Sequence, residues 1–169
     1  AHDVEFCGIR SEGLLPISKS DDYICVIDEK GNEVINLKEF EGKEVLACYA
    51  YSDSKLRVVL EDGSIVYLDK TGKMLFGSRF SWGTDFRQGH VVVQNLKQNS
   101  DLYSFVDETA SSIFTFESED KDYITISYDM ELLSAKENDK MIIYDFGGKR
   151  VLQCPSKVEG IYSFCQDGF

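Results

Sequence analysis

Short, mostly apolar runs, each followed by an aspartate and a turn-forming stretch, recur four times along the chain. The aspartates, called anchor aspartates below, are Asp28, Asp69, Asp107 and Asp145, at intervals of 41, 38 and 38 residues. The sixth and seventh residues after each anchor are apolar: Val34-Ile35, Leu75-Phe76, Ile113-Phe114 and Val151-Leu152. A fixed period in this range is the signature of a repeat architecture such as a propeller or a solenoid.

Each anchor predicts a tight turn between two antiparallel strands. Aspartate suits the first turn position because its carboxylate accepts the backbone N–H two residues further on. Gly31, Gly72 and Gly148 suit the fourth position because glycine tolerates positive φ. Ala110 stands at that position in the third turn, where positive φ would strain it. The third turn is therefore either strained or of a different type.

Between successive anchors two further β segments are expected, so that four strands fill about 40 residues, as in one propeller blade. Asp62-Gly63 predicts a two-residue hairpin turn between strands at 56–60 and 64–68. No apolar stripe at helical spacing extends beyond two turns. We predict an all-β, propeller-like array of four-stranded antiparallel units in one domain: 1–37, 38–76, 77–116, 117–152 and a partial fifth at 153–169. Either the last strand closes a small ring with the first unit, or the chain is part of a longer array.

The turn pattern apolar-Asp-x-x-Gly-x-x-apolar-apolar, with the segment F-R-Q-G-H-V-V-V at residues 86–93, resembles the bacterial WG-repeat proteins over roughly residues 12–165. Units of that family carry an I-D-x-x-G turn and an F-x-x-G-x-x-x-V stretch. The family's Trp-Gly pair should precede Ile-Asp, but this chain has its one Trp-Gly pair, Trp82-Gly83, elsewhere in its unit. Residues 63–73 also resemble blades of quinoprotein-type propellers. Both resemblances imply a β-propeller-like repeat protein.

The composition of the chain limits the classes of partner that it is expected to bind. The chain is 43% hydrophobic and 12% aromatic, which excludes intrinsic disorder, and its apolar runs are too short to span a membrane. Lys and Arg total 18 against 30 Asp and Glu, a net charge of −12. Phosphate backbones are bound chiefly by Lys and Arg, so we do not expect nucleic acid as a partner. The acidic surface favours solubility and cationic partners.

Five cysteines form an odd set without C-x-x-C spacing. Cys25 and Cys48 lie within apolar strand-like runs, where a thiol behaves as a small buried hydrophobe. We therefore predict free thiols and no structural disulfide, which favours a reducing, cytoplasmic compartment. Because the sequence begins with Ala1, a mature secreted form or an excised piece stays open.

Residues with catalytic chemistry are scarce. The histidines are His2 and His90, and neither belongs to a nucleophile, phosphate-loop or zinc motif. Four carboxylates between the third and fourth units lack the spacing of a calcium loop and predict a solvated loop: Glu117, Glu119, Asp120 and Asp122. We expect no enzyme activity, no metal and no cofactor.

The richest recognition candidate is the segment 79–87, which contains the one tryptophan of the chain. Trp82, Arg79 and Asp85 form the predicted binding residues, because aromatic and Arg side chains are common at binding hot spots. Alternatively, Phe80, Trp82 and Phe86 alternate because they fill the core from one strand face. The sequence thus predicts a non-catalytic module that binds a protein or a surface ligand. The alternatives are a quinoprotein-like or carbohydrate-binding propeller domain completed by further blades or a partner.

Overall fold

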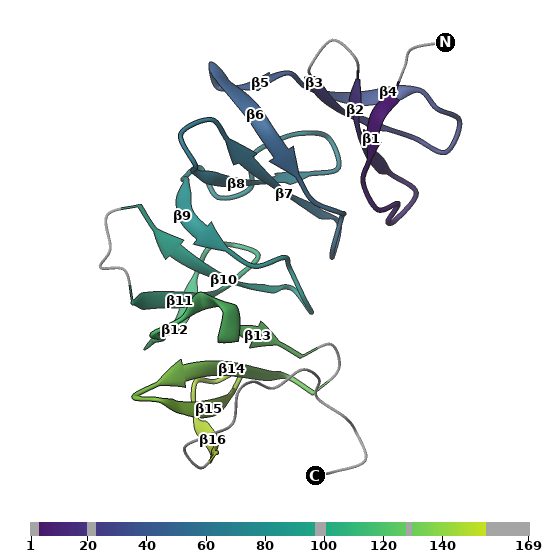
Figure 1. Cartoon of the computed structure of the whole chain (residues 1–169). Coiled ribbons are helices and arrows are strands. Elements are labelled where there is room, and N and C mark those ends of the chain that lie inside the picture. The colour runs from purple at the N-terminus through teal and green to yellow at the C-terminus, as the bar shows by residue number, and fades with distance from the viewer. Residues whose placement is uncertain (1–3, 20–22, 97–100, 128–129, 155–169) are drawn as a thin grey trace. The chain divides into compact units, whose positions relative to one another are not determined.

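β-Strands dominate the computed structural model, which describes residues 4–19, 23–96, 101–127 and 130–154 (Figure 1). Within these ranges the single helical element is a 3-10 turn, η1 (Lys121–Tyr123). The described strand pairs are antiparallel, so the predicted all-β antiparallel fold is confirmed. The chain forms two compact units, residues 1–86 and residues 87–169, called the N-unit and the C-unit. Their division falls inside the third predicted repeat, 77–116.

The N-unit consists of strands that pair in the order in which the chain supplies them. Its first sheet has the order β1 (Val4–Cys7), β2 (Leu15–Lys19), β3 (Tyr23–Ile27) and β4 (Glu33–Leu37). The following strands are β5 (Glu39–Phe40), β6 (Lys43–Cys48), β7 (Lys55–Leu60), β8 (Ile65–Asp69) and β9 (Phe80–Gly83), each paired with the next. The strand predicted at 74–76 is reduced to one bridge between Leu68 and Met74.

The C-unit follows the same sequential order. Its first three strands are β10 (His90–Asn95), β11 (Leu102–Asp107) and β12 (Ser112–Glu117). After η1 comes a four-stranded sheet of β13 (Thr125–Ile126), β14 (Leu132–Glu137), β15 (Lys140–Asp145) and β16 (Arg150–Gln153). Most of the predicted fifth unit, from residue 155 onward, lies outside the described residues.

All four anchor aspartates begin the same turn. The N–H of the fourth residue donates to the anchor's carbonyl oxygen at 2.9–3.1 Å in every case. The anchor's Oδ1 accepts the N–H of the fifth residue: Asn32, Lys73, Ser111 and Lys149. The fourth residue is left-handed throughout, with φ of +80° at Gly31, +83° at Gly72 and Gly148, and +64° at Ala110. The third turn is therefore the same turn with a strained alanine. All four turns are present, but the one at Asp69 leads into a single bridge at Met74 instead of the predicted strand.

The prediction at Asp62-Gly63 was right about the hairpin and wrong about its turn. A two-residue type I′ turn needs positive φ at both central residues, but only Gly63 has it, at +76°. The N–H of Gly63 donates to Leu60 O at 2.8 Å and the N–H of Leu60 donates to Ser64 O at 2.9 Å, the backbone pattern of the anchor turns. Two-residue turns with positive φ at both positions lie elsewhere: Glu12-Gly13, Glu41-Gly42, Asp53-Ser54, Gln88-Gly89 and Asn138-Asp139.

Both units bury aliphatic and aromatic side chains. The N-unit buries mainly aliphatic side chains between its sheets: Val26, Ile35, Leu37, Val45, Leu56, Val58, Leu60, Val66 and Leu68, with Tyr51. The C-unit packs Phe114, Phe116 and Tyr144 together, with ring centroids 5.5–5.9 Å apart.

In both units, the glycine of one anchor turn lies against a residue seven positions after the preceding anchor. A Cβ on Gly72 would stand 3.1 Å from Cγ2 of Ile35, and a Cβ on Gly148 would stand 2.7 Å from Cγ of Phe114. The same repeat positions therefore make the contact between neighbouring repeats in each unit.

Glu12 links two turns of the N-unit. Its carboxylate accepts the N–H and the hydroxyl of Ser54 at 2.9 and 3.1 Å, and it forms an ion pair with Lys70 at 2.9 Å. Partial burial acts to raise the pKa of Glu12, but the hydrogen bonds from Ser54 and Lys70 outweigh it and lower that pKa. The turn at Glu12-Gly13 is therefore tied both to the turn at Asp53-Ser54 and to the anchor turn that contains Lys70.

Candidate binding surface

The segment from β9 to Phe86 begins in the core of the N-unit. Phe80 and Phe86 are buried, and both pack edge-on against Tyr67, with ring centroids 6.0 and 5.4 Å away. Phe76 completes the cluster at 5.6 Å from Tyr67. The core interpretation is therefore correct for Phe80 and Phe86. Trp82, between them, is half-buried.

Side chains from β7, β8 and the turn before β7 hold the backbone of this segment. Nη1 of Arg57 donates to Gly83 O at 2.5 Å, the hydroxyl of Tyr67 donates to Thr84 O at 2.7 Å, and Oγ of Ser52 donates to Phe86 O at 2.5 Å. Burial raises the pKa of Tyr67, so its hydroxyl keeps its proton. These three bonds hold the backbone at Gly83, Thr84 and Phe86.

Arg57 also forms the centre of a small surface cluster, the Tyr49–Arg57–Asp85 cluster. Its Nε lies 2.9 Å from Oδ1 of Asp85, and its guanidinium lies 3.6 Å from the centroid of the Tyr49 ring. Tyr49 is 42% exposed, whereas Arg57 is largely buried beneath it. A cation over an aromatic face is attracted by about 0.5–2 kcal/mol, depending on how far it is desolvated. The cluster therefore presents an aromatic ring to solvent in a fixed orientation.

Arg79 does not belong to the Tyr49–Arg57–Asp85 cluster. Its Nη2 donates to Oε2 of Glu41 at 3.0 Å and its Nη1 lies 3.7 Å from Oδ2 of Asp62. Asp62 follows the end of β7, whereas Arg57, the partner of Asp85, lies near the start of that strand. Asp85 therefore lies in the same segment as Trp82, residues 80–86, called the Trp82 segment below, whereas Arg79 pairs with a different set of carboxylates.

Sequence reasoning missed Tyr49 and Arg57. The signal for Arg57 was present, because it stands at an outward position of β7 between the buried Leu56 and Val58. Its stacking on Tyr49 follows from the β6–β7 pairing, in which the N–H of Tyr49 donates to Arg57 O at 3.0 Å. The sequence did not predict the register of that pairing.

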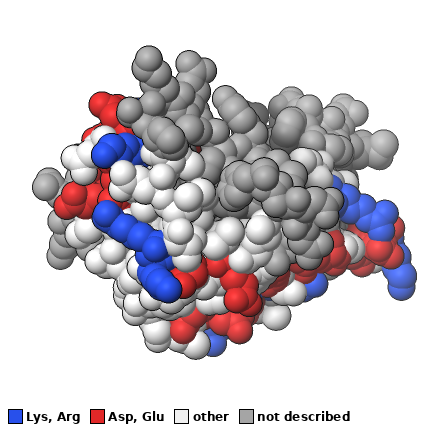
Figure 2. All heavy atoms as spheres, turned by 90° about the horizontal axis from the view of Figure 1, so that it is seen from below, with Lys and Arg blue, Asp and Glu red and all other residues white. Residues whose placement is uncertain are grey.

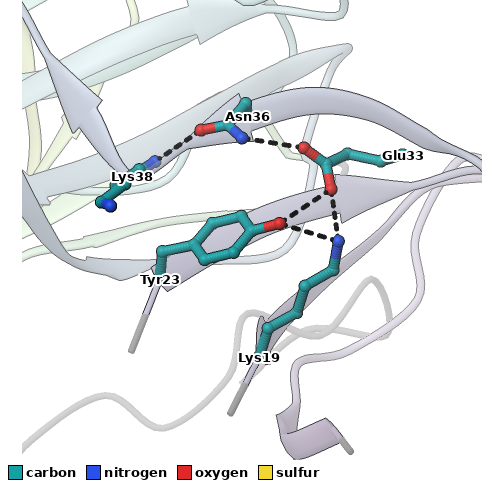
Figure 3. Close-up of polar contacts among 5 residues, drawn as sticks. All are labelled: Lys19, Tyr23, Glu33, Asn36 and Lys38. Carbon is teal, nitrogen blue, oxygen red and sulfur yellow. Dashed lines mark hydrogen bonds and ion pairs between the residues drawn. The ribbon is translucent and has the colours of Figure 1, made fainter. Parts of the chain in front are cut away.

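A second polar network spans β2, β3 and β4 of the first sheet (Figure 3). Nζ of Lys19 contacts the Tyr23 hydroxyl at 2.9 Å and pairs with Glu33, while Nδ2 of Asn36 donates to Glu33 at 2.9 Å. The hydrogen bond with Lys19 is the main cause of the lowered pKa of Glu33. Cys25 is buried, and burial raises its pKa, as is typical of a structural thiol.

His90 has structural contacts. Its Nδ1 lies 2.6 Å from Gln88 O, and its ring stacks on Phe105 at 5.0 Å with 7° between the planes. Of the acidic loop residues, Asp120 caps η1 by accepting the N–H of Asp122 at 2.9 Å. Among the described residues no group of three His, Cys, Asp or Glu is placed to hold a metal ion.

Three of the five cysteines, Cys25, Cys48 and Cys154, are free thiols. The side chains of Cys7 and Cys165 lie outside the described part of the chain, so the predicted absence of any disulfide stays a prediction for them. No helix within the described ranges has the length and apolar character needed to cross a membrane.

Basic and acidic side chains are mixed on the face of the molecule drawn in Figure 2. On the face in Figure 2, Lys and Arg (blue) stand beside Asp and Glu (red) and form no continuous basic patch among the described residues. Individual pairs include Lys43 with Asp62 at 3.1 Å and Lys136 with Asp139 at 3.3 Å. This distribution agrees with the prediction that nucleic acid is not a partner, which stays a prediction.

No family model matches the sequence, and no curated protein sequence matches it. Several solved structures, in contrast, resemble the fold of this chain. Hsv2 of Kluyveromyces lactis matches with a TM-score of 0.62 at 10% identity, over 89% of this chain and 50% of that one. BamB from Moraxella catarrhalis gives 0.56 at 16% identity, over 87% and 48%. A streptogramin B lyase gives 0.51 at 18% identity, over 90% and 55%.

BamB and the streptogramin B lyase are β-propeller proteins. The propeller-like fold predicted from the repeats is therefore confirmed. The identities are too low to carry anything beyond the fold. This chain spans about half the length of the solved structures it matches.

Proposed function

We propose that this chain is a non-catalytic, β-propeller-like module that binds a protein partner through the Tyr49–Arg57–Asp85 cluster and the adjoining Trp82 segment. The observation that carries the proposal is the exposed Tyr49 ring stacked on an Arg57 whose guanidinium is tied to Asp85 and to the backbone of Gly83. Aromatic and Arg side chains supply most of the energy at protein interfaces.

Rigidity strengthens this argument. Binding normally costs about 0.5–1.5 kcal/mol for each long side chain that becomes immobilised. Arg57 is already held by Gly83 and Asp85, and Tyr49 is already stacked on Arg57. The cluster would therefore lose little conformational freedom on meeting a partner.

The test uses affinity capture with wild type, Tyr49→Ala and the control Ile113→Ala as baits, followed by titration of the captured protein. Ile113 is a suitable control because its exposure, 39%, is close to the 42% of Tyr49, and it lies in the C-unit. We expect Tyr49→Ala to weaken binding about thirtyfold, the equivalent of a hot spot of about 2 kcal/mol, and Ile113→Ala to leave it unchanged. A partner that both variants bind equally well would refute this surface.

The non-catalytic part of the proposal rests on the contacts of His90, which serve structure, and on the scarcity of catalytic motifs in the sequence. A carbohydrate-binding role is the alternative, because the exposed face of Tyr49 also suits stacking on a sugar ring. Screening the chain against a glycan array, with Tyr49→Ala as the control, separates the two roles.

The finer assignment to bacterial WG repeats is also a proposal. It is supported by the I-D-x-x-G type of turn at Asp28 and by the stretch at 86–93, whose Gln88-Gly89 forms a two-residue turn. The position of Trp82-Gly83 departs from that family. Homologues with Trp-Gly before their anchor aspartates would support the assignment, and homologues that consistently lack it would contradict it.

A further inference from the structure

A cavity of about 430 Å³ opens in the C-unit beside β12, β15 and β16. The β12–β16 pocket, as we call it, has three aromatic rings in its lining, those of Phe114, Phe116 and Tyr144. Its charged lining residues are Glu117, Glu137 and Arg150. Aromatic faces combined with carboxylates favour an organic cation, because both attract positive charge.

Glu137 is the fixed charge of the pocket. Its side chain is only 9% exposed, and its carboxylate accepts the hydroxyl of Tyr144 and pairs with Nη2 of Arg150. Burial, with the hydrogen bond to Glu137 adding to it, raises the pKa of Tyr144 to about 12, so Tyr144 remains a donor at neutral pH. A buried carboxylate that loses its cation is strongly destabilised. Anything that displaces Arg150 must therefore bring a positive charge.

Arg150 is the cation of the pocket that a ligand can replace. Its side chain is 60% exposed, and its guanidinium lies 5.7 Å from the centroid of the Tyr144 ring. Because most of the Arg150 side chain already lies in water, its release needs little further change once another cation reaches Glu137. Arg150 thus occupies the pocket as a built-in cation that a ligand of the same chemistry can replace.

We propose that the β12–β16 pocket receives the guanidinium group of an arginine side chain from a protein partner, which takes the place of Arg150 at Glu137. A planar guanidinium pairs with a carboxylate and stacks on aromatic rings at the same time, which a compact ammonium does less well. The net charge of −12 attracts such a partner from a distance. This site lies in the C-unit and does not depend on the function proposed for the N-unit cluster.

The test is an NMR titration of the full chain with the peptide acetyl-Gly-Arg-Gly-amide at about 0.15 M salt, where long-range attraction is screened beyond about 8 Å. The matched peptide carries citrulline, the neutral isostere of arginine. Arg150→Gln should bind the arginine peptide about tenfold more tightly than wild type, because the competing side chain is gone. The shifted amides should belong to residues that line the pocket, in β12, β14, β15 and β16 and next to them, and the citrulline peptide should shift none of them.

Arg10→Gln is the control for charge. Arg10 is also an exposed arginine, 61% exposed, and pairs with Glu29 in the N-unit. We expect it to behave as wild type. An equal gain in Arg10→Gln, equal binding of the citrulline peptide, or shifts confined to residues away from the pocket would each overturn the proposal. Tighter binding of free arginine than of the peptide would indicate a small-molecule site and would also overturn it.

Glu137→Gln provides a second arm, since Gln keeps an acceptor for Tyr144 and removes the charge. Its melting curve is recorded first, and binding is compared at a temperature where the variant is folded. Loss of arginine-peptide binding supports the proposal, and retained binding contradicts it. If this variant does not fold, the Arg150→Gln titration decides alone.

Discussion

The N-unit and the C-unit make the same contact between repeats with different side chains. In the N-unit, the anchor-turn glycine Gly72 faces the aliphatic Ile35, and in the C-unit Gly148 faces the aromatic Phe114. A Cβ added to Gly72 would lie 3.1 Å from Cγ2 of Ile35, whereas a Cβ added to Gly148 would lie only 2.7 Å from Cγ of Phe114. The turn thus determines where the repeats meet, and the partner residue determines how strictly glycine is required.

A second comparison concerns charge. Lys19, Tyr23 and Glu33 form a network in the first sheet, and Glu137, Tyr144 and Arg150 form one in the last. Glu33 and Arg150 both stand five residues after an anchor, and both pair with the last residue of the second strand of their sheet. The signs are reversed between the two networks. The first and the fourth repeats therefore pair the same two positions with opposite polarity, whereas Met74 and Ser112 stand at the fifth position after the other two anchors.

The largest expected effect tests the glycine contact. Gly148→Ala should lower the free energy of unfolding by about 3 kcal/mol, because a left-handed alanine costs about 1 kcal/mol and overpacking against Phe114 adds the rest. Gly72→Ala should fall between this and Gly31→Ala, where a Cβ meets nothing within 4 Å. Urea unfolding of the three variants measures the series. Equal losses at Gly31 and Gly148 would show that the ring contact is unimportant.

Trp82→Ala tests the half-buried residue of the N-unit. We expect a loss of about 2 kcal/mol, below the about 3–5 kcal/mol of a fully buried aromatic such as Phe86. Thermal or urea unfolding of Trp82→Ala and Phe86→Ala compares the two directly. Unchanged stability together with lost partner binding would make Trp82 purely a recognition residue, and a loss equal to that of Phe86→Ala would make it purely a core residue.

Ala110→Gly is expected to stabilise the chain by about 1 kcal/mol, because φ at this position is +64° and glycine adopts that conformation without strain. The gain would bring the third turn into line with the other anchor turns. The reverse change at Gly31, Gly31→Ala, is the matched control and should be destabilising by a similar amount. A neutral or destabilising Ala110→Gly would mean that the turn is not strained.

The smallest expected effect is on the stability of the chain at low pH. The pKa of Asp69 is lowered, chiefly by the hydrogen bond from Thr71, and that of Asp107 chiefly by the bond from Thr109. A lowered folded-state pKa adds stability above the ordinary value of 3.8 that is lost as the pH falls through the folded-state value. Asp69→Asn and Asp107→Asn should each reduce the difference in stability between pH about 7 and pH about 3. Glu61→Gln, outside the anchor turns, is the control, and an equal reduction there would refute the assignment.

The sequence predicted the anchor turns because their chemistry is local. Asp28 and Gly31 lie within one turn, and each bond follows from residue type and spacing. At Asp62-Gly63 local information did not suffice, since the same dipeptide suits two turn types and the flanking Leu60–Ser64 pairing selects one. The Tyr49–Arg57–Asp85 cluster joins residues far apart in sequence, so only the register of β6, β7 and the Trp82 segment brings it together.

Within each unit, strand order along a sheet repeats strand order along the chain. Contacts between neighbours in sequence form quickly, because short loops lose little entropy on closing. The same ordering has an evolutionary meaning. A gene that gains or loses one whole repeat of about 40 residues adds or removes strands without any chain crossing. The new repeat can pack on its neighbour through the same contact between an anchor-turn glycine and the residue seven positions after the preceding anchor. Length is therefore the property of this protein that duplication can change most readily.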